Sequence, residues 1–307
     1  MKPMKIKHKG DRGELIFYSI LIALPLLQIC IFYFYVNFNS ILLSFQDYSV
    51  KKDKFYFVGG DQFKDIWSDL TSGTQSYLWP ALKNSIVVWF FTSGLGTFLA
   101  ILFAYYIYKK WWIAKTFKFF LFLPSVLPSV LFVGVYEYFM KDAVPGYLGE
   151  VLGIKVQPLL TGYSSVLPGV IFFNVFVCFG AQLLIYTGAM DQISPDVIEA
   201  GQVDGVSSSR EFFSIVLPMI LPTISTFIIA SVATVFTNQA NLFAFFGSSG
   251  TNLAKEDYTI GYYLFMMVER DGEKAYSYAS ALGIICTLIA FPLTMGVRRL
   301  LNRGEEK

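Results

Sequence analysis

The amino-acid sequence predicts an all-α integral membrane protein with six transmembrane helices. Of its 307 residues, 55% are hydrophobic and only 15% are charged, and the mean hydropathy is +0.54. A soluble domain of this size carries about 25% charged residues. A membrane-spanning helix needs about 20 apolar residues, because each residue adds 1.5 Å and the hydrocarbon core is about 30 Å thick. Six runs are long enough, at residues 15–45, 81–108, 119–140, 166–187, 215–238 and 276–301.

The first run follows a lysine-rich tail, as the apolar region of a secretory signal peptide does. Such a region is about 7 to 15 residues long and ends at a small-residue cleavage site. The run at 15–45 is longer and shows no such site, so we expect an uncleaved helix in which Pro25 introduces a kink. The expected units are a basic tail at 1–14, the first helix with an outer loop at 15–80, a five-helix core at 81–301 and a second tail at 302–307.

Lysine and arginine set the expected orientation, because these residues are enriched in cytoplasmic loops. The segments on one side of the six runs hold 14 basic residues, whereas the three loops on the other side hold nine despite their greater length. The richer side consists of 1–14, 109–118, 188–214 and the carboxyl-terminal end with Arg298 and Arg299; the other side consists of 46–80, 141–165 and 239–275. We therefore expect a multi-pass protein of the cell (plasma or inner) membrane with both termini in the cytoplasm.

The inner segment at 188–214 differs from the other inner segments because it is acidic. Its charged residues are Arg210 and five acids, namely Asp191, Asp196, Glu199, Asp204 and Glu211. Ser194 directly before Pro195 predicts the start of a helix. Gly205 can take the left-handed conformation that ends this helix after about Asp204.

A second short helix is predicted after this break. Ser208 and Glu211, three residues apart, form a capping-box pattern for a helix that leads into the fifth run. In the first helix, Ala200 and Gly201 follow Val197 by three and four residues, so one face is narrow enough for another protein to approach closely. A well-capped connection that only stabilises the fold is an equally good interpretation of this pattern.

The residues from Glu199 to Pro218, EAGQVDGVSSSREFFSIVLP, resemble the EAA loop of permeases from binding-protein-dependent ABC importers. The family pattern is EAA, three residues, Gly, nine residues and IxLP; the residues that match it are Glu199, Ala200, Gly205, Ile215, Leu217 and Pro218. Two positions depart from the commonest form, since Gly201 replaces the second alanine and Val206 replaces a frequent alanine after the glycine. The resemblance extends over about 81–299 and includes ALKNSI at 81–86, FLPSVLPSV at 122–130 and YSYASALG at 276–283.

The layout is similar to the first permease of maltose-type carbohydrate importers, which implies a type I ABC importer permease fold and transport of a sugar or oligosaccharide. In such importers an extracellular binding protein delivers the solute, two non-identical permeases form the path, and two cytoplasmic ATPases hydrolyse ATP. The resemblance implies that the ATPase contacts the loop and that its closure rotates the membrane helices. The loop residues implied in this coupling are Glu199, Ala200, Gly201, Asp204, Gly205, Ile215, Leu217 and Pro218.

The sequence has no GxxxxGK(S/T) phosphate loop. We therefore expect a transport subunit without ATPase activity and without a cofactor of its own, with ATP and Mg bound by the partner ATPases. Polar side chains at membrane depth usually face a bundle interior or a watery path. The candidates for a solute path are Asn84, Asn174, Gln182 and Asn238. Hydrogen bonding between helices is the alternative, and we favour it for these residues.

The remaining residues exclude several classes of function. The only histidine, His8, lies in the first tail, so we expect neither an imidazole-based catalytic site nor a metal site. The three cysteines lie in separate apolar runs, and the net charge is only +2, so we expect no disulfide and no nucleic-acid partner. Glu137 lies four residues before Lys141, which favours a local ion pair over a charge relay. The alternative functions are a secondary transporter, a membrane enzyme or an importer permease for a non-sugar solute.

Overall fold

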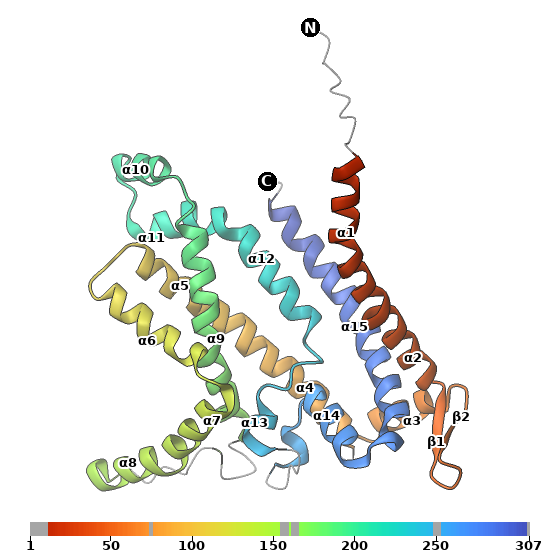
Figure 1. Cartoon of the computed structure of the whole chain (residues 1–307). Coiled ribbons are helices and arrows are strands. Elements are labelled where there is room, and N and C mark those ends of the chain that lie inside the picture. Colours follow the sequence, from red (N-terminus) through yellow and green to blue (C-terminus); the bar gives the residue numbers. More distant parts are fainter. Residues whose placement is uncertain (1–11, 74–75, 154–159, 161–165, 248–252, 306–307) are drawn as a thin grey trace.

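The computed structural model describes residues 12–73, 76–153, 160, 166–247 and 253–305 (Figure 1). Most of the predicted tail at 1–14 and the last two residues of the tail at 302–307 lie outside the described residues. The described part is mostly helical, which confirms the predicted fold class. It contains five helices that are long and apolar enough to cross a membrane, and a sixth span if two helices joined by a sharp bend count as one.

Several spans consist of consecutive helices joined by a π-helical segment. The first span is α1 (Arg12–Gln28), a π-helical segment at Ile29–Tyr35 and α2 (Val36–Leu43); the second is α4 (Leu78–Trp89), a π-helical segment at Phe90–Leu95 and α5 (Gly96–Tyr108). The fourth is α9 (Val166–Met190), the fifth is α11 (Ser208–Glu211) with a π-helical segment at Phe212–Val216 and α12 (Leu217–Ala233), and the sixth is the 33-residue α15 (Glu273–Glu305).

The third predicted span, 119–140, is not one straight helix. The helices in this region are α6 (Ala114–Val126), α7 (Ser129–Tyr138), a π-helical segment at Phe139–Ala143 and α8 (Val144–Leu152). The chain bends by 108° between α6 and the helices that follow. Pro128 disfavours a helical conformation at the residue before it, and Leu127 is indeed extended, with ψ 141°. Apolar composition predicts that a segment is buried in a membrane, but it does not reveal such a break.

The predicted outer loop at 46–80 contains a small folded cap. Strands β1 (Gln46–Ser49) and β2 (Lys54–Phe57) pair in antiparallel register, with Gln46 opposite Phe57, and α3 (Asp61–Thr71) follows. Both β1 and α3 contact α15. The hydroxyl of Tyr278, near the start of α15, donates a hydrogen bond of 2.5 Å to Asp69 Oδ2 of α3. The cap is thereby fixed to the last span.

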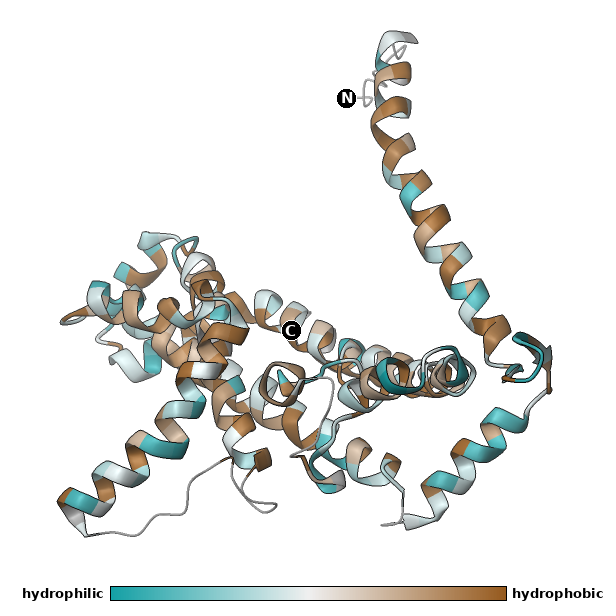
Figure 2. Ribbon diagram, turned by 60° about the horizontal axis from the view of Figure 1, so that its bottom comes forward, coloured by the Kyte–Doolittle hydropathy of each residue, from teal (hydrophilic) through white to brown (hydrophobic). Residues whose placement is uncertain are grey.

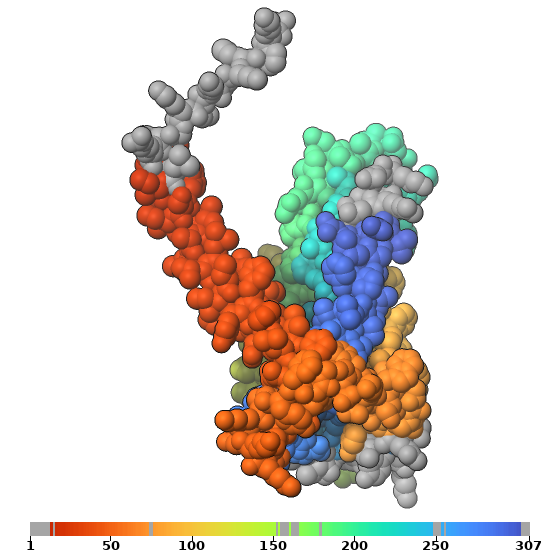
Figure 3. All heavy atoms as spheres, turned by 90° about the vertical axis from the view of Figure 1, so that its right-hand side faces the viewer, coloured from red at the N-terminus to blue at the C-terminus, as the bar shows by residue number. Residues whose placement is uncertain are grey.

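The first span leans away from the rest of the molecule. Its lower part, α2, contacts α15, whereas α1 diverges from it (Figure 3). Apolar residues run along its whole length (Figure 2), and their side chains are exposed, for example Leu24 at 74% and Tyr33 at 71%. Such a surface is stable only against lipid or against another protein chain.

The other spans enclose two apolar cores, one toward each end of the bundle. The first includes Val88 and Phe173, and the second includes Leu183 and Phe212. The helix α9 contacts α5, α6 and α12. A Cβ atom at Gly180 would lie 2.4 Å from Ser125 Oγ, so glycine is required for the close approach of α9 and α6. Because it contributes to both cores, α9 is the central helix of the described bundle.

Short elements lie at both ends of the bundle. At one end is α10 (Pro195–Val203), on the same side as the start of α1 and the end of α15 (Figure 1). At the other end, near α3, are α13 (Leu242–Phe246), a 3₁₀ turn at Lys255–Asp257 and α14 (Ile260–Asp271). The segment with the acidic predicted helix is therefore separated from the cap by the length of the spans.

Candidate functional site

The predicted helix in the segment 188–214 is confirmed as α10. Ser194 occupies the N-cap position and Pro195 the first helical position, although the Ser194 side chain makes no capping hydrogen bond. At the other end Gly205 has φ +73°. The amide of Val206 donates to the carbonyl of Gly201 (3.0 Å), and that of Gly205 donates to the carbonyl of Gln202 (3.0 Å). This pair of hydrogen bonds is a Schellman motif, which requires the left-handed residue that glycine supplies here.

The start of the second helix lies one residue earlier than predicted. Ser207, in an extended conformation, is the N-cap of α11, and its Oγ accepts a hydrogen bond from the amide of Arg210 (3.5 Å). Ser208 is the first helical residue, so the capping box predicted for Ser208 and Glu211 is wrong. Three consecutive serines are chemically equivalent as N-caps, and their sequence does not distinguish them.

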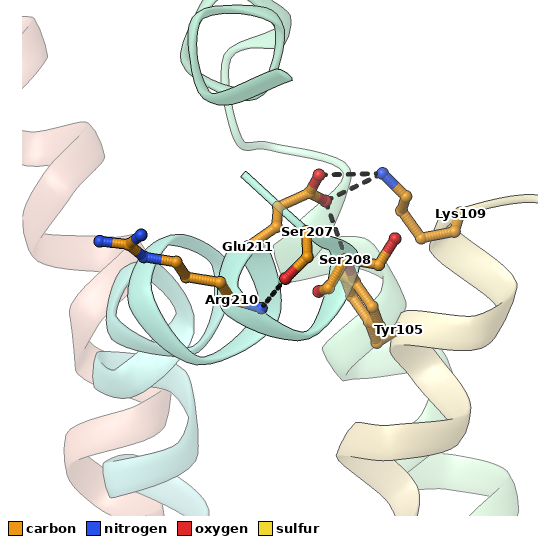
Figure 4. Close-up of polar contacts among 6 residues, drawn as sticks. All are labelled: Tyr105, Lys109, Ser207, Ser208, Arg210 and Glu211. Carbon is orange, nitrogen blue, oxygen red and sulfur yellow. Dashed lines mark hydrogen bonds and ion pairs between the residues drawn. The ribbon is translucent and has the colours of Figure 1, made fainter. Parts of the chain in front are cut away.

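Glu211 instead forms a buried cluster with α5 (Figure 4). Lys109 Nζ lies 2.9 Å from Oε1 and 3.1 Å from Oε2 of Glu211. The hydroxyl of Tyr105 is 3.0 Å from Glu211 Oε1 and 2.9 Å from the carbonyl oxygen of Ser208. The Glu211 side chain is only 3% exposed and that of Lys109 17% exposed. This pair could not be predicted from the sequence, because the two residues are 102 positions apart and the capping-box pattern assigned Glu211 a different partner.

The residues of α10 divide between a packed side and an exposed side. Ile198 and Gly201 are buried, whereas Glu199, Ala200 and Asp204 are exposed. Val203, at 87% exposed, is the most exposed large apolar residue of this helix. The predicted narrow face is therefore divided: Gly201 faces the bundle, whereas Val197 and Ala200 lie on the exposed side. The exposed side combines carboxylates with an apolar residue that has no cover within the described chain.

The other predicted loop residues lie where the loop enters the fifth span. Ile215 is half-buried within the π-helical segment, Leu217 is half-buried at the start of α12, and Pro218 is exposed. Pro218 occupies one of the first positions of α12, where the absence of an amide hydrogen is tolerated. These three residues therefore connect the loop to α12.

Three of the four predicted path residues line one cavity of about 120 Å³, namely Asn174, Gln182 and Asn238. The other lining residues are mostly hydroxyl-bearing: Ser85, Thr92, Ser93, Ser231, Thr234 and Thr259, with Val88, Trp89 and Val235. The hydroxyl groups were missed from the sequence, because serine and threonine are common in membrane helices and carry no distinguishing spacing. Asn84 does not line the cavity; its Nδ2 donates to the carbonyl of Tyr258 (3.0 Å).

The asparagines of the cavity wall also hold the chain after α12. Asn174 Nδ2 donates to the carbonyl of Ala240 (2.8 Å), and its Oδ1 accepts from Asn241 Nδ2 (2.7 Å). Asn238 Oδ1 accepts from the amide of Ala240 (2.8 Å). Ala240 and Asn241 both have positive φ, so this turn needs such support. Asn174 and Asn84 thus make structural hydrogen bonds, but their partners at Ala240 and Tyr258 lie in connecting segments rather than in neighbouring helices, which the favoured interpretation expects.

Gln182 is the path candidate whose side-chain hydrogen bond is longest. Its Oε1 accepts a hydrogen bond of 3.5 Å from Thr97 on α5, at the limit of such contacts. Thr92 and Ser93, on the facing span, lie in the π-helical segment at Phe90–Leu95. Segments of this kind are frequent at functional sites in helices. The arrangement offers hydroxyl and amide groups that can hydrogen bond a polyhydroxylated solute.

Comparison with known proteins decides the family. Residues 96–307 match the family described as "Binding-protein-dependent transport system inner membrane component". The chain belongs to this family. The match of this inner membrane component confirms the predicted resemblance, and it does not support the alternative of a secondary transporter, because the family is defined by its dependence on a binding protein.

Relatives of this inner membrane component cover most of its length. The multiple sugar-binding transport system permease protein MsmF of Streptococcus mutans is 24% identical, over 87% of this chain and 89% of its own. The lactose transport system permease protein LacF of Rhizobium radiobacter is 22% identical, over 90% of each chain. The sn-glycerol-3-phosphate transport system permease protein UgpA of Agrobacterium fabrum is 27% identical, over 71% and 72%.

A solved structure confirms the fold of this inner membrane component. One chain of a bacterial alginate ABC transporter, in complex with an alginate pentasaccharide-bound periplasmic protein, superposes with a TM-score of 0.75. The match covers 96% of this chain and 97% of the other, at 18% sequence identity. The predicted permease fold is therefore established by both sequence and structure.

Proposed function

We propose that this chain is one of two non-identical permease subunits of an ATP-driven importer that carries a sugar or oligosaccharide into the cytoplasm. The proposal rests mainly on the segment that contains α10 in this member of the family. This segment, residues 191–207 between α9 and α11, is called the α10 loop. It presents an exposed acidic side at one end of the bundle while Ile198 and Gly201 hold it against the spans. A loop fixed in this way can pass a force from a partner to the membrane helices.

The proposed partner at α10 is a cytoplasmic ATPase, one of a pair. Glu199 and Asp204 offer carboxylates for charge-assisted hydrogen bonds, and Val203 offers an apolar contact. In this proposal ATP and Mg bind to the ATPases, and this chain holds no cofactor. The α10 end, with the start of α1 and the end of α15, then lies in the cytoplasm of a plasma or inner membrane, as the distribution of basic residues also favours.

The two other proposed partners occupy different surfaces. The exposed apolar surface of α1 suits a second permease as well as lipid, since it is covered by no described part of this chain. The binding protein would dock at the opposite end, where the cap, α13 and α14 lie. The solute would then pass the cavity lined by Asn174, Gln182 and Asn238.

The proposed cargo is a sugar or oligosaccharide, because the cavity is lined mainly by hydroxyl and amide groups and no ionised side chain is among its described lining residues. Two relatives support this class, because one is named for a multiple sugar-binding transport system and the other for lactose transport. A third relative is named for sn-glycerol 3-phosphate transport, so a phosphorylated polyol is the alternative cargo. A phosphate group usually requires a cationic partner.

Purification through an affinity tag on this chain tests the assembly. We expect mass spectrometry to find one copy of this chain with a different permease and two ATPase subunits. Glu199→Lys should reduce the amount of ATPase that copurifies, whereas Glu269→Lys, a reversal at an exposed site on α14, should not. A homodimer without ATPase would overturn the proposal.

Uptake into proteoliposomes tests the cargo. The complex would be reconstituted with its binding protein and supplied with radiolabelled lactose, maltose, alginate oligosaccharides or sn-glycerol 3-phosphate. ATP-dependent accumulation of a sugar supports the proposed class. Accumulation of sn-glycerol 3-phosphate alone would replace it with the phosphorylated polyol.

A further inference from the structure

The buried cluster of Glu211, Lys109 and Tyr105 joins the loop to a span that is not adjacent to it in sequence. Glu211 ends α11, directly after the α10 loop, and Lys109 is the C-cap of α5. Both carboxylate oxygens of Glu211 accept hydrogen bonds from Lys109 Nζ, and Tyr105 adds a contact to the backbone of Ser208. The loop therefore has an attachment to α5 in addition to its covalent attachments to α9 and α12.

An ion pair is not needed to stabilise this position. Removing two charges from water costs about as much as their attraction returns, and apolar residues of similar size often hold helices together equally well. The ion pair instead defines the position of α11 relative to α5, because its geometry fixes three atoms: Lys109 Nζ and the two carboxylate oxygens of Glu211. One further contact, between the rings of Tyr105 and Phe212 at 4.9 Å, lies beside it.

The attached span leads directly to the cavity. Residues 78–108 form one continuous helical span of 31 residues. One end carries Tyr105, close to Lys109, and the other half carries cavity residues from Ser85 up to Ser93 at the midpoint of the span. The two places are joined by a single rod, in which the π-helical segment at Phe90–Leu95 is the irregular part.

We infer that Glu211 is a positioning residue that, through Lys109 and Tyr105, transmits displacement of the α10 loop to α5 and along that span to the cavity wall. The inference rests on the proposed function, because it needs an ATPase that moves the loop. It adds a second route of transmission beside the direct connection from α11 into α12. Movement of two walls of the cavity, one from α4 and the π-helical segment that precede α5 in the span 78–108 and one from α12, follows from one displaced loop.

The test compares charge reversals within the intact importer. The variants are Lys109→Glu, Glu211→Lys and the double exchange, with Tyr105→Phe as a variant that leaves the charges in place. The matched control exchanges the ion pair of Glu137 and Lys141 (3.1 Å), which is half-exposed and distant from α10. Each variant carries Ser93→Cys in a background in which Cys30, Cys178 and Cys286 are replaced.

The readout is the rate at which a membrane-impermeant methanethiosulfonate reagent labels the cysteine at position 93. It is measured without nucleotide and after trapping with ATP and vanadate. In the parent and in the control exchange, we expect the labelling rate to differ between the two nucleotide states by about 5-fold or more, which is the lower end of typical allosteric coupling. Each single reversal should abolish this difference while the ATPase still copurifies, Tyr105→Phe should reduce it, and the double exchange should restore it.

The outcomes separate the inference from the proposed function. If the parent shows no nucleotide-dependent change and no ATPase copurifies, the proposed function fails. If the parent responds and both single reversals respond equally well, the inference alone fails. Where the single reversals lose both ATPase binding and correct insertion, the test depends on Tyr105→Phe. If this variant inserts normally and its labelling rate changes with nucleotide as much as that of the parent, the inference is overturned.

Discussion

Gly201 of α10 lies directly against Ile215, the residue that begins the IxLP part of the loop. A Cβ atom at position 201 would be 2.9 Å from Ile215 Cδ1. Real Cβ atoms do not come this close, so the isoleucine side chain must move if any larger residue replaces glycine. Because Cδ1 is the flexible end of the isoleucine side chain, it can move aside for a small substituent at position 201 more easily than for a large one.

Substitutions at Gly201 should therefore be graded by size. Gly201→Ala should be tolerated, because Ile215 can change rotamer, whereas Gly201→Val should displace α10 and lower binding-protein-stimulated ATP hydrolysis by about tenfold, equivalent to about 1.4 kcal/mol. The double variant Gly201→Val with Ile215→Ala should recover most of the loss. ATP turnover of the reconstituted complex measures all three. A double variant as impaired as Gly201→Val would show that contact with Ile215 is not the cause.

Gly205 tests the backbone conformation alone, because no atom lies within 4 Å of the position that a Cβ would take. Its φ of +73° disfavours a β-branched residue by roughly 1–2 kcal/mol. We expect Gly205→Val to insert normally yet lose solute uptake and stimulated ATP hydrolysis. Gly205→Asn is the control, since asparagine tolerates the left-handed region. Equal uptake by the two variants would show that the Schellman turn has no part in coupling.

The cavity residues should separate by their structural contacts. Asn174→Leu removes hydrogen bonds to Ala240 and Asn241, so it should lower the stability of the protein by roughly 1–3 kcal/mol. Gln182→Leu removes only one long hydrogen bond and should leave thermal unfolding nearly unchanged while it impairs uptake. Thermal unfolding in detergent and uptake in proteoliposomes are compared. Normal uptake by Gln182→Leu would remove this residue from the proposed path.

Gly261 should not tolerate even alanine. A Cβ at this position would lie 2.6 Å from the carbonyl oxygen of Thr237 and 2.9 Å from the carbonyl carbon of Asn238, both backbone atoms that cannot turn aside. Gly261→Ala should lower the free energy of unfolding by roughly 1–3 kcal/mol. The matched variant Gly283→Ala, where no atom lies within 4 Å, should not destabilise the protein. A common melting temperature for the two variants would contradict this packing.

Asp257, in the 3₁₀ turn before α14, should make stability depend on pH. Burial and the neighbouring Glu256 carboxylate raise its pKa from 3.8 to about 6, and its Oδ2 has no hydrogen-bond partner among the residues that the structure describes. The folded protein therefore holds the proton more tightly than the unfolded chain does, and stability falls as the pH rises from about 4 to about 6. Above that range the penalty is constant, at most about 3 kcal/mol.

Replacing this carboxylate removes the titration. Asp257→Asn should raise the melting temperature relative to the parent at pH 8, and the difference should shrink at pH 5, where the parent is largely protonated. Asp271→Asn, an exposed acid paired with Arg270, is the control and should show no gain at pH 8. A gain for Asp257→Asn that is equal at both values of pH would exclude ionisation as the cause.

Local signals in the sequence were sufficient to predict the helix of the loop. Ser194, Pro195 and Gly205 act on the backbone of their own neighbours, so the beginning and end of α10 could be predicted without the rest of the fold. The same kind of signal was ambiguous at Ser207 and Ser208, where adjacent serines can serve equally as caps. Hydropathy alone predicted an unbroken third span, because it averages over Leu127 and Pro128.

Contacts between distant residues could not be predicted from local signals. The pair of Lys109 and Glu211 depends on how α5 and α11 pack, and each residue alone resembles an ordinary charge at the end of a span. Some residues of the cavity could be selected from the sequence, because amides such as those of Asn174 and Gln182 are rare at membrane depth. Its hydroxyl groups, such as Ser93, are too common to be distinguished without the fold.

The length of α15 has a consequence for the bilayer itself. Its 33 residues extend over about 50 Å, whereas the hydrocarbon core is about 30 Å thick. One end is tied to the cap through Tyr278 and Asp69. A helix of this length meets a thinner or thicker membrane by changing its tilt, and a tethered end makes the cap turn with it. A change in lipid acyl-chain length that altered the tilt of α15 would therefore also change the angle of the cap.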